Sequence, residues 1–351
     1  MARSTIRDVA RHAGVSIATV SRVMRDSTTV RPDTRDRVMI AAQELEYVPS
    51  QLGRQLAERR YAANGIVFPD LSGPYYAEVV LGYENVASEL RRSVLILSTH
   101  GRPDAEAAVR DMAARCDGLV LLGRTVSDQV VEQLAARGTR IVLIARPPVG
   151  DIDSINAENH DSAVALTEHV LEGGARSLAF IGDPASSPDV AERWGGLRQA
   201  AGVGGAEVYL VAEPELDEDA GASAVTRLLE AYRPEGLPDA LVCANDELAL
   251  GAMQRLRESG IDVPGSVQVT GWDDVMAARY AGLTTVRQPM RELGETAARL
   301  LDELITGTPR EPRHGTLPTE LVIRASTRAA PPTPTPELTS TSSHPHGRNH
   351  R

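Results

Sequence analysis

Residues 13–24 read AGVSIATVSRVM and contain few charges for a helix on the surface of a protein. The single charged side chain in the stretch is Arg22, and the others are small, hydroxylated or β-branched. Gly14 can supply a tight turn, and Ser16 can cap a helix that begins at residue 17. The stretch therefore predicts the turn and second helix of a helix-turn-helix, and it raises the question of what the outward side of that helix contacts.

The flanking residues complete a three-helix unit. Thr5 can cap a first helix over residues 6–13, and a third helix is expected over about residues 33–46. The third helix offers apolar residues that can close a small core: Val38, Ile40 or Ala41, and Leu45. An ordinary αα-hairpin would also accommodate small residues and a glycine turn. We favour a helix-turn-helix head over residues 1–49.

The outward side of the second helix has the composition of a DNA-reading surface. Val20 and Val23 face the first helix. The other side presents Ile17, Ala18, Ser21 and Arg22. A short apolar side chain can contact a thymine methyl group, and an arginine can donate two hydrogen bonds to guanine O6 and N7. We interpret this side as an interface with the major groove, and we include Thr5, Ser16 and Thr19 among the candidate DNA contacts.

Residues 50–61 are interpreted as a hinge. A short helix is expected over residues 51–58, with Leu52 and Leu56 one turn apart. Gly53 costs roughly 1 kcal/mol relative to Ala, so this helix should be marginal alone. It would form when a surface covers its leucines, and the DNA minor groove, which apolar side chains can enter, is one such surface. A plain interdomain linker is the alternative.

The charge distribution separates the head from the rest of the chain. Residues 1–60 contain 11 Arg against 7 acidic residues, whereas the remainder contains 26 Arg against 41 acidic residues. A locally basic segment is typical of a phosphate-binding module, although a solvated face can carry the same charge. The sequence has neither an apolar run of about 18 residues nor the apolar region of a signal peptide, so we expect a cytoplasmic protein that does not associate with membranes.

From residue 62 onward, β-branched runs alternate with segments of helical periodicity. Runs with strand character occupy residues 65–69, 94–98, 118–122, 140–145, 177–182, 207–211, 240–245 and 267–271. Continuous apolar strands separated by helices predict parallel sheets covered on both faces, and this number of units exceeds one comfortable sheet. The predicted fold class is therefore α/β: an all-α head, then a two-lobed core over 62–328. The stretch 329–351, rich in Pro, Ser, Thr and His, should be a disordered tail.

Metal and enzyme chemistry are not indicated. Cys116 and Cys243 lie far apart without a CxxC motif, so we interpret both as core thiols. His344, His346 and His350 could bind a metal, but a solvated tail is the simpler interpretation. The sequence contains no GxGxxG after the first core strand, no Walker loop, no GxSxG and no HExxH. We therefore expect neither a cofactor nor an enzymatic activity.

The motifs together resemble the lactose/galactose repressor (LacI/GalR) family over roughly residues 4–327. The matching segments are TIRDVARHAGVSIATVSRVM, TVRPDTRDRVMIAAQELEYVPSQLGRQLA, AERWGGL, CANDELALGAM, VTGWDD and LTTVRQPMRELGETAARLLDELI. The resemblance implies a homodimeric transcription regulator with a periplasmic-binding-protein-like core, its chain crossing three times between the lobes. The implied lobes are an N-lobe at about 62–158 and 288–315, and a C-lobe at about 159–287 and 316–328. It also implies that Ile17, Ala18 and Arg22 read bases of a double-stranded operator, and that Leu56 enters its minor groove.

The same resemblance implies a small-molecule site at Arg193, Asn245 and Asp273. Arginine and asparagine offer paired donors and aspartate accepts from vicinal hydroxyls, so the chemistry fits a polyol, and we expect a carbohydrate effector. Each residue has a structural alternative: Arg193 as a surface side chain, and Asn245 and Asp273 as helix caps. All three fall near carboxyl ends of strands, the edge where open α/β sheets bind ligands. Tyr75 and Tyr76, expected in the loop after the first core strand, could add a stacking platform.

Two questions stay open at this point. A transport-type sugar-binding protein would share the core, but it would have a signal peptide and no use for a basic head. Repressor and activator cannot be separated from sequence, and an effector could release or promote DNA binding; a repressor is the form we expect. Ala145 stands where many sugar-binding members of the family have Asp.

Overall fold

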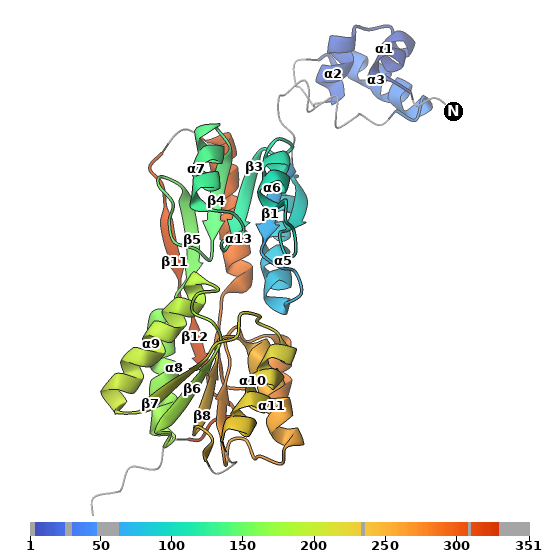
Figure 1. Ribbon diagram of the computed structural model, residues 1–351. Helices are drawn as coiled ribbons and strands as arrows, with labels where there is room; N and C mark the ends of the chain where they lie inside the picture. The colour runs from blue at the N-terminus through green and yellow to red at the C-terminus, as the bar shows by residue number, and fades with distance from the viewer. Residues whose placement is uncertain (1–3, 25–29, 48–62, 233–235, 308–309, 330–351) are drawn as a thin grey trace, which may run out of the picture.

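The computed structural model describes residues 4–24, 30–47, 63–232, 236–307 and 310–329. Figure 1 shows the helical head and the two lobes of the core. The predicted hinge at 50–61, with Leu56, and the tail beyond residue 329 lie outside the described residues. Within the described ranges, no helix is both long and apolar enough to cross a lipid bilayer.

In its described part, the head forms three short helices: α1 (Ile6–Ala13), α2 (Ile17–Met24) and α3 (Pro32–Glu44). At the start of α1, the backbone N–H and the hydroxyl of Thr5 both donate to the Asp8 carboxylate, at 3.0 and 2.6 Å. Gly14 adopts a φ of +64°, a left-handed conformation that ends α1 at low steric cost. Ser16 Oγ accepts from the Thr19 backbone N–H at 3.1 Å and so caps α2. The predicted helix starts and the turn are confirmed.

A small apolar core holds the head together. It is formed by Val9, Ala10, Ala13, Val20, Val23, Val38, Ala41 and Ala42. Of the two alternatives on the third helix, Ala41 is buried, whereas Ile40 is 56% exposed. Val20 and Val23 face inward as predicted, so the opposite side of α2 is available for contacts outside the head.

The first lobe is built on a parallel sheet with the strand order β11-β5-β4-β3-β1-β2. Its described strands are β1 (Ala63–Phe68), β2 (Ser93–Ser98), β3 (Gly118–Leu122), β4 (Arg140–Ile144), β5 (Asp153–Ala157) and β11 (His314–Leu317). Helices α5 (Pro74–Glu89) and α13 (Met290–Thr306) cover one face, and α6 (Ala105–Ala113) and α7 (Asp128–Ala136) cover the other. Successive strand residues alternate between the faces: Phe68 packs in the cluster with α5 and α13, and Val67 in the cluster with α6 and α7.

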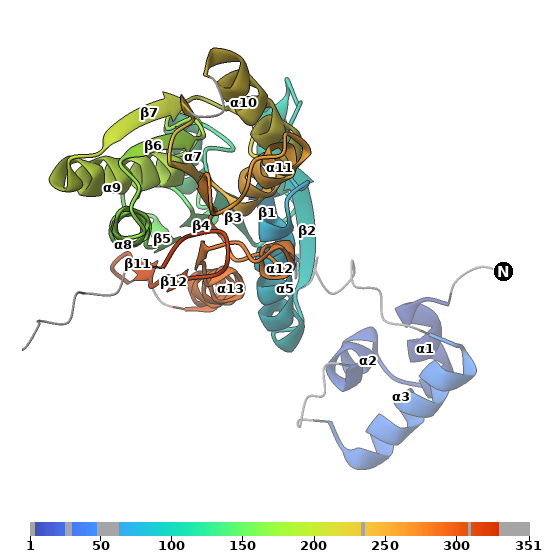
Figure 2. The same cartoon turned by 90° about the horizontal axis from the view of Figure 1, so that it is seen from below.

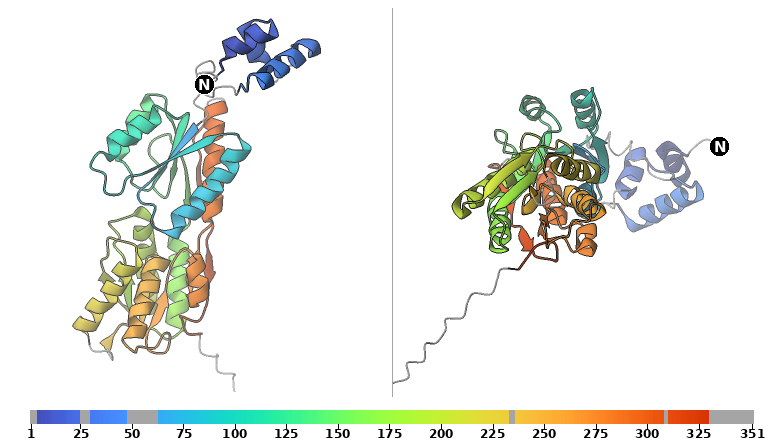
Figure 3. Two further views of the ribbon diagram at one scale, coloured as in Figure 1. Left: turned by 90° about the vertical axis from the view of Figure 1, so that its right-hand side faces the viewer. Right: turned by 60° about the horizontal axis from the view of Figure 1, so that its bottom comes forward.

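Helices α5 and α13 lie side by side, as Figure 3 shows, because glycines allow their backbones to approach closely. A Cβ atom added at Gly82 would lie 2.0 Å from the backbone oxygen of Arg291, and one at Gly294 would lie 2.1 Å from that of Val79. Any larger residue at either position would therefore force the two helices apart.

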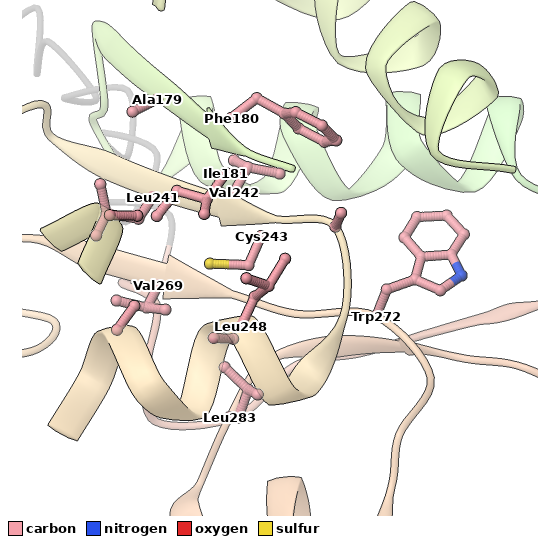
Figure 4. Packing of buried hydrophobic residues seen from close by; sticks show 14 of the residues in the cluster. Ala179, Phe180, Ile181, Leu241, Val242, Cys243, Leu248, Val269, Trp272 and Leu283 are labelled. Carbon is pink, nitrogen blue, oxygen red and sulfur yellow. The ribbon is translucent and has the colours of Figure 1, made fainter. Parts of the chain in front are cut away.

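The second lobe has a parallel sheet in the order β7-β6-β8-β9. Its strands are β6 (Ser177–Ile181), β7 (Glu207–Val211), β8 (Ala240–Cys243) and β9 (Gln268–Thr270). Helices α8 (His160–Glu172) and α9 (Pro188–Gly204) pack together, as do α10 (Glu218–Ala231) and α11 (Asp246–Glu258), and Figure 2 shows the two pairs on opposite faces of the sheet. Figure 4 shows Ile181, Val242 and Val269 from neighbouring strands in the core of this lobe.

The described chain crosses between the lobes at three places. It crosses between β5 and α8, between β10 (Thr285–Arg287) and α13, and between β11 and β12 (Glu320–Val322), where β10 and β12 pair antiparallel. Because β11 extends to Leu317, the last crossing lies beyond residue 317 and not at residue 315 as expected. All eight predicted strands are present as strands β1 to β4 and β6 to β9. The missed strands β5, β10, β11 and β12 are short or polar, so they lack the apolar runs that marked the others.

Candidate functional site

The exposed side of α2 presents the predicted reading residues together. Ile17 is 45% exposed, and Ala18 and Arg22 are also exposed, whereas Thr19 and Ser21 are half-buried. Ile17 is not among the described residues that form the apolar core of the head or pack against it. The side therefore offers apolar groups for thymine methyls and one guanidinium for a guanine edge.

The hydroxyl groups beside this surface are already engaged within the head. The Thr5 hydroxyl donates to Asp8, and the Ser16 and Thr19 hydroxyls share a hydrogen bond of 2.9 Å. These groups fix the ends of α1 and α2, so their direct effect is to orient the exposed side of α2.

A cavity of about 290 Å³ lies where the two lobes meet. Its walls come from both lobes, and the five predicted ligand residues all line it: Tyr75, Tyr76, Arg193, Asn245 and Asp273. A cavity of this size suits a small molecule that touches both lobes at once. The structure thus brings together residues that are up to about 200 positions apart in the sequence.

The two tyrosines lie in the first turn of helix α5 and not in a loop as expected. Pro74 at the first helical position, after Gly73, starts this helix immediately before Tyr75, because proline is well suited to that position. The rings of Tyr75 and Tyr76 meet edge to face with centroids 5.4 Å apart, and Tyr76 packs in the same manner on Phe68 at 5.6 Å. Both rings are half-buried, so they form an aromatic wall of the cavity.

Arg193 is buried on α9, with only 6% of its surface exposed, so the alternative of a surface arginine is wrong. Its Nε donates to Asn159 Oδ1 at 2.8 Å, and its Nη1 donates to the backbone oxygen of Ala244 at 2.7 Å. The guanidinium also lies 4.6 Å from the ring centroid of Trp272, a distance typical of a cation–π contact. These three contacts fix the guanidinium at the cavity wall.

Asn245 caps helix α11, which is the structural alternative considered for it in the sequence. It is the N-cap of α11, where its Oδ1 accepts from the Leu248 backbone N–H at 3.0 Å. Its Nδ2 donates to the backbone oxygen of Leu216 at 2.9 Å and to Glu247 Oε2 at 3.1 Å. Both amide hydrogens are therefore engaged, and a ligand in the cavity can use only the remaining acceptor capacity of Oδ1.

Asp273 is held in the cavity wall by an uncommon backbone conformation. Its φ is +114°, and its backbone N–H donates to the Val286 oxygen at 2.8 Å. Its carboxylate accepts from Gln288 Nε2 at 2.5 Å and is 4% exposed. Helix α12 (Met276–Ala281) begins after Val275 without a side-chain cap, so the alternative of Asp273 as a helix cap is wrong.

Three acidic residues of this region were missed by the sequence reasoning. Asp189 and Glu247 line the cavity, and the fully buried Asp246 accepts from the Val275 backbone N–H at 2.9 Å and from Thr285 Oγ1 at 2.6 Å. Asp246 thereby ties α11 to the loop that carries Asp273. A signal for Asp189 and Glu247 was present, because each stands in the first turn of a helix that follows a strand of the ligand-binding edge.

Burial makes these carboxyl groups hold their protons more tightly than usual. Burial, reinforced by the charge of Asp273, raises the pKa of Glu247 to about 8. Burial raises the pKa of Asp273 to about 6, although the nearby Arg193 acts in the opposite direction. Burial also raises the pKa of Asp189. The cavity therefore disfavours additional negative charge.

Cys116 and Cys243 are free and buried, which confirms both as core thiols. In the described ranges, no group of three or more His, Cys, Asp or Glu residues is arranged to hold a metal ion.

Comparison with known proteins gives two matching family models. Residues 5–50 match the model of bacterial regulatory proteins of the lacI family, and residues 167–327 match a periplasmic binding protein-like domain. The ribose operon repressor of Halalkalibacterium halodurans is 31% identical over 330 residues, which cover 93% of this chain and 97% of that protein.

Solved structures match over the same extent. A lac repressor dimer bound to operator and the anti-inducer ONPF is 29% identical, with a TM-score of 0.83, over 93% of this chain and all of that one. A complex of the transcriptional regulator CelR with cellobiose is 31% identical, with a TM-score of 0.68, over 92% of this chain and all of that one. The helix-turn-helix head, the two-lobed core and these matches identify the chain as a DNA-binding transcriptional regulator that belongs to the lacI family of bacterial regulatory proteins.

Proposed function

We propose that this protein is a cytoplasmic repressor that acts as a homodimer and whose operator affinity is controlled by a carbohydrate bound between the lobes. The observation that carries the proposal is the cavity, because both lobes contribute its walls while the head of the same chain presents a DNA-reading helix. The ribose operon repressor and the cellobiose-bound regulator, both about one-third identical, support a carbohydrate as the effector. We assign no enzymatic activity to the chain.

On DNA, we assign base contacts to the exposed side of α2. Ile17 and Ala18 would contact thymine methyl groups and Arg22 a guanine edge. Four hydroxyl groups would contact the phosphate backbone and so help to orient the head on the DNA, because hydroxyls and helix ends commonly do so. They belong to Thr5, Ser16, Thr19 and Ser21. Leu56 would enter the minor groove from the hinge.

In the cavity, the polar residues would bind the ring hydroxyls and the tyrosines would pack on the ring. The guanidinium of Arg193 can donate from its nitrogens that face the cavity, and Asp273 can accept from vicinal hydroxyls. Asn245 would contribute through Oδ1. The apolar edges of a sugar ring would lie against Tyr75 and Tyr76.

Binding of such a ligand would be coupled to the arrangement of the lobes. The tyrosines belong to the first lobe, and Arg193 and Asp273 belong to the second, so a ligand that contacts both groups favours one lobe arrangement over another. Since the first lobe follows the head in the chain, this preference would reach the DNA-binding unit through the hinge.

The proposed dimer has a candidate surface in the second lobe. Met276 and Tyr280 on α12 are 73% and 82% exposed, and Ile323 is 58% exposed. The two segments are adjacent, because the Ser326 backbone N–H donates to the Gly282 oxygen at 3.0 Å. Large apolar side chains that are this exposed together are typical of a surface that another chain covers.

The proposal is tested by selecting bound fragments from random DNA and then titrating the selected complex with carbohydrates. We expect a near-palindromic site, bound by two chains with a strongly salt-dependent affinity, and release by at least one sugar. Binding without sequence preference would contradict the assigned role of α2. A selected complex that no carbohydrate affects would contradict the assigned role of the cavity.

A further inference from the structure

The inner wall of the cavity carries more negative than positive groups. Among the described residues that line it, the buried or half-buried ionisable side chains of the second lobe are Asp189, Glu247 and Asp273 against Arg193. Of the other charged residues of the lining, Arg124, Glu215 and Asp217 are exposed, and Asp70 of the first lobe is a further half-buried acid. The ligand therefore meets three carboxyl groups and one guanidinium where water is most excluded.

The guanidinium is not committed to these carboxyl groups. Arg193 donates its hydrogen bonds of 2.7 and 2.8 Å to the neutral oxygens of Ala244 and Asn159. Asp274, next to the cavity residue Asp273, shows the contrast: its side chain is buried and accepts from both Arg287, at 2.7 Å, and Arg324, at 2.5 Å. Asp274 is thus neutralised within the protein, whereas the one side chain that hydrogen-bonds to Asp273 among the described residues is the amide of Gln288.

Apart from the donors of Arg193, acceptor atoms are left for a ligand on the inner wall. Gln288 is 4% exposed, and its Oε1 has no hydrogen-bond partner within the described part of the chain, because its Nε2 is the atom directed to Asp273. The oxygens of ionised carboxylates are acceptors as well. A ligand that satisfies this wall must be rich in donors, and an ammonium group supplies three donors and a positive charge on one atom.

Helix N-termini at the cavity would favour an anionic ligand instead, because they carry a partial positive charge. Two of these ends are already occupied, because Ser187 Oγ accepts from the Asp189 backbone N–H at 3.2 Å and Asn245 caps α11. The acids in the first turns of these helices, Asp189 and Glu247, compensate the dipoles further. Burial raises the pKa of both groups.

The raised pKa of Glu247 reflects the same surplus of negative charge. The pKa of Glu247 is raised to about 8 by burial and by the charges of Asp273, Asp246 and Glu218. A bound proton is a positive charge, and a ligand ammonium could replace it at the same place. The half-buried faces of Tyr75 and Tyr76 on the opposite wall also attract a cation.

We propose that the effector carries a protonated amine and that this cavity takes an amino sugar in preference to the parent sugar or its phosphate. The inference rests on the proposed carbohydrate function of the same cavity. The ammonium group would lie against Asp189, Glu247 and Asp273, while Arg193 and Gln288 bind hydroxyls. A phosphate group would face three carboxyl groups with one partly committed guanidinium and would be rejected.

The test uses matched sugars that differ in one group. The full-length protein is titrated calorimetrically at neutral pH with glucose, glucosamine, N-acetylglucosamine and glucose 6-phosphate, and with the corresponding galactose and mannose series. In the series that binds, we expect the amine to bind about tenfold or more tightly than the parent sugar, the equivalent of one unit of pKa. We expect the neutral amide to lose this gain, and the phosphate to bind least.

Substitutions of the cavity acids test whether these residues cause the preference for the amine. Glu247→Gln and Asp189→Asn should each reduce the ratio of amine to parent affinity. Glu230→Gln, exposed on α10 and outside the cavity lining, should preserve it. Two acid variants are used so that the result does not depend on the folding of either one.

The outcomes separate the inference from the function on which it rests. If the parent sugar or the phosphate binds as tightly as the amine, the amine preference is wrong and the carbohydrate function stands. If none of the sugars binds in any form, the carbohydrate function is contradicted and the inference falls with it. An amine preference that persists in both acid variants would also overturn the inference.

Discussion

The reading side of α2 and the wall of the cavity organise their functional residues in opposite ways. Ile17, Ala18 and Arg22 are exposed and lie outside the apolar core of the head. Arg193 and Asp273 are buried in a network of hydrogen bonds and close charges. Substitutions in the head should therefore change recognition at little cost in stability, whereas substitutions in the cavity should change both together.

The largest expected effect is that of Arg193→Ala in the cavity. The substitution removes the single buried cation beside Asp189 and Asp273, and loss of one partner from a buried charged group costs roughly 3 kcal/mol or more. We expect a destabilised core, measured by denaturant unfolding, and loss of the effector response in an operator-binding assay. Operator binding without effector should be retained, because the head folds around its own core.

The matched control for Arg193 is Arg198→Ala on the same helix. Arg198 is exposed, and its guanidinium lies over the ring of Trp194 at 5.8 Å. Its removal should change the free energy of unfolding by less than about 0.5 kcal/mol and leave the effector response intact. Equal losses of unfolding free energy and of effector response in the two variants would show that the burial of Arg193 does not set it apart from Arg198.

In the head, Arg22→Ala tests the opposite half of the comparison. We expect a loss of roughly 1 to 3 kcal/mol in binding to the cognate operator and a much smaller loss on non-specific DNA, because base contacts carry specificity. The unfolding transition should stay within about 0.5 kcal/mol of the wild type, since Arg22 is exposed. Similar losses on both DNAs would assign Arg22 to the phosphate backbone instead.

The pH dependence of stability tests the charge surplus of the cavity. The folded pKa of Glu247 is about 8 against an ordinary value of 4.5, so in this range the folded state binds a proton that the unfolded chain releases. The stabilisation is therefore complete below pH 4.5 and is lost as the pH rises toward 8. Asp273 contributes in the same sense between 3.8 and about 6.

Glu247→Gln should remove most of this dependence. The variant should be more stable than the wild type at alkaline pH by at least about 1 kcal/mol, because one unit of pKa is equivalent to about 1.4 kcal/mol and the shift from 4.5 to about 8 exceeds one unit. The difference should shrink as the pH falls. Thermal or urea unfolding across the range measures it, with Glu215→Gln as the exposed control. Parallel curves for wild type and Glu247→Gln would mean that Glu247 is already charged in the folded protein.

What could be predicted from the sequence follows the range of the interactions involved. The turn at Gly14 and the cap at Ser16 depend on residues within a few positions, and both were predicted correctly. The eight strands were predicted because each has a run of apolar and β-branched residues, whereas β5, with the sequence DSINA, has none. Asp189 and Glu247 each stand in the first turn of a helix that follows a strand, but an acid at that position commonly only compensates the helix dipole, so the pattern alone did not single them out.

The smallest expected effect is at Ser16, a residue of the head that does not follow the difference between head and cavity. Ser16 belongs to the head, yet its hydroxyl is engaged, since it accepts from the Thr19 backbone N–H at 3.1 Å and pairs with the Thr19 hydroxyl at 2.9 Å. Ser16→Ala should therefore behave like a cavity substitution and destabilise the head by about 1 kcal/mol. Because α2 would then be less well ordered, operator and non-specific DNA should be bound more weakly by similar factors.

Ser16→Asp distinguishes a cap from a DNA contact. An aspartate can accept the same hydrogen bond from Thr19 and is favoured at the start of a helix, so it should restore the unfolding free energy of the isolated protein. Its charge would repel a nearby phosphate, so DNA binding should stay weak if Ser16 also lies against the backbone of the operator. If Ser16→Asp recovers both stability and DNA binding, Ser16 acts as a cap alone. If it recovers neither, the cap at Ser16 does not position α2.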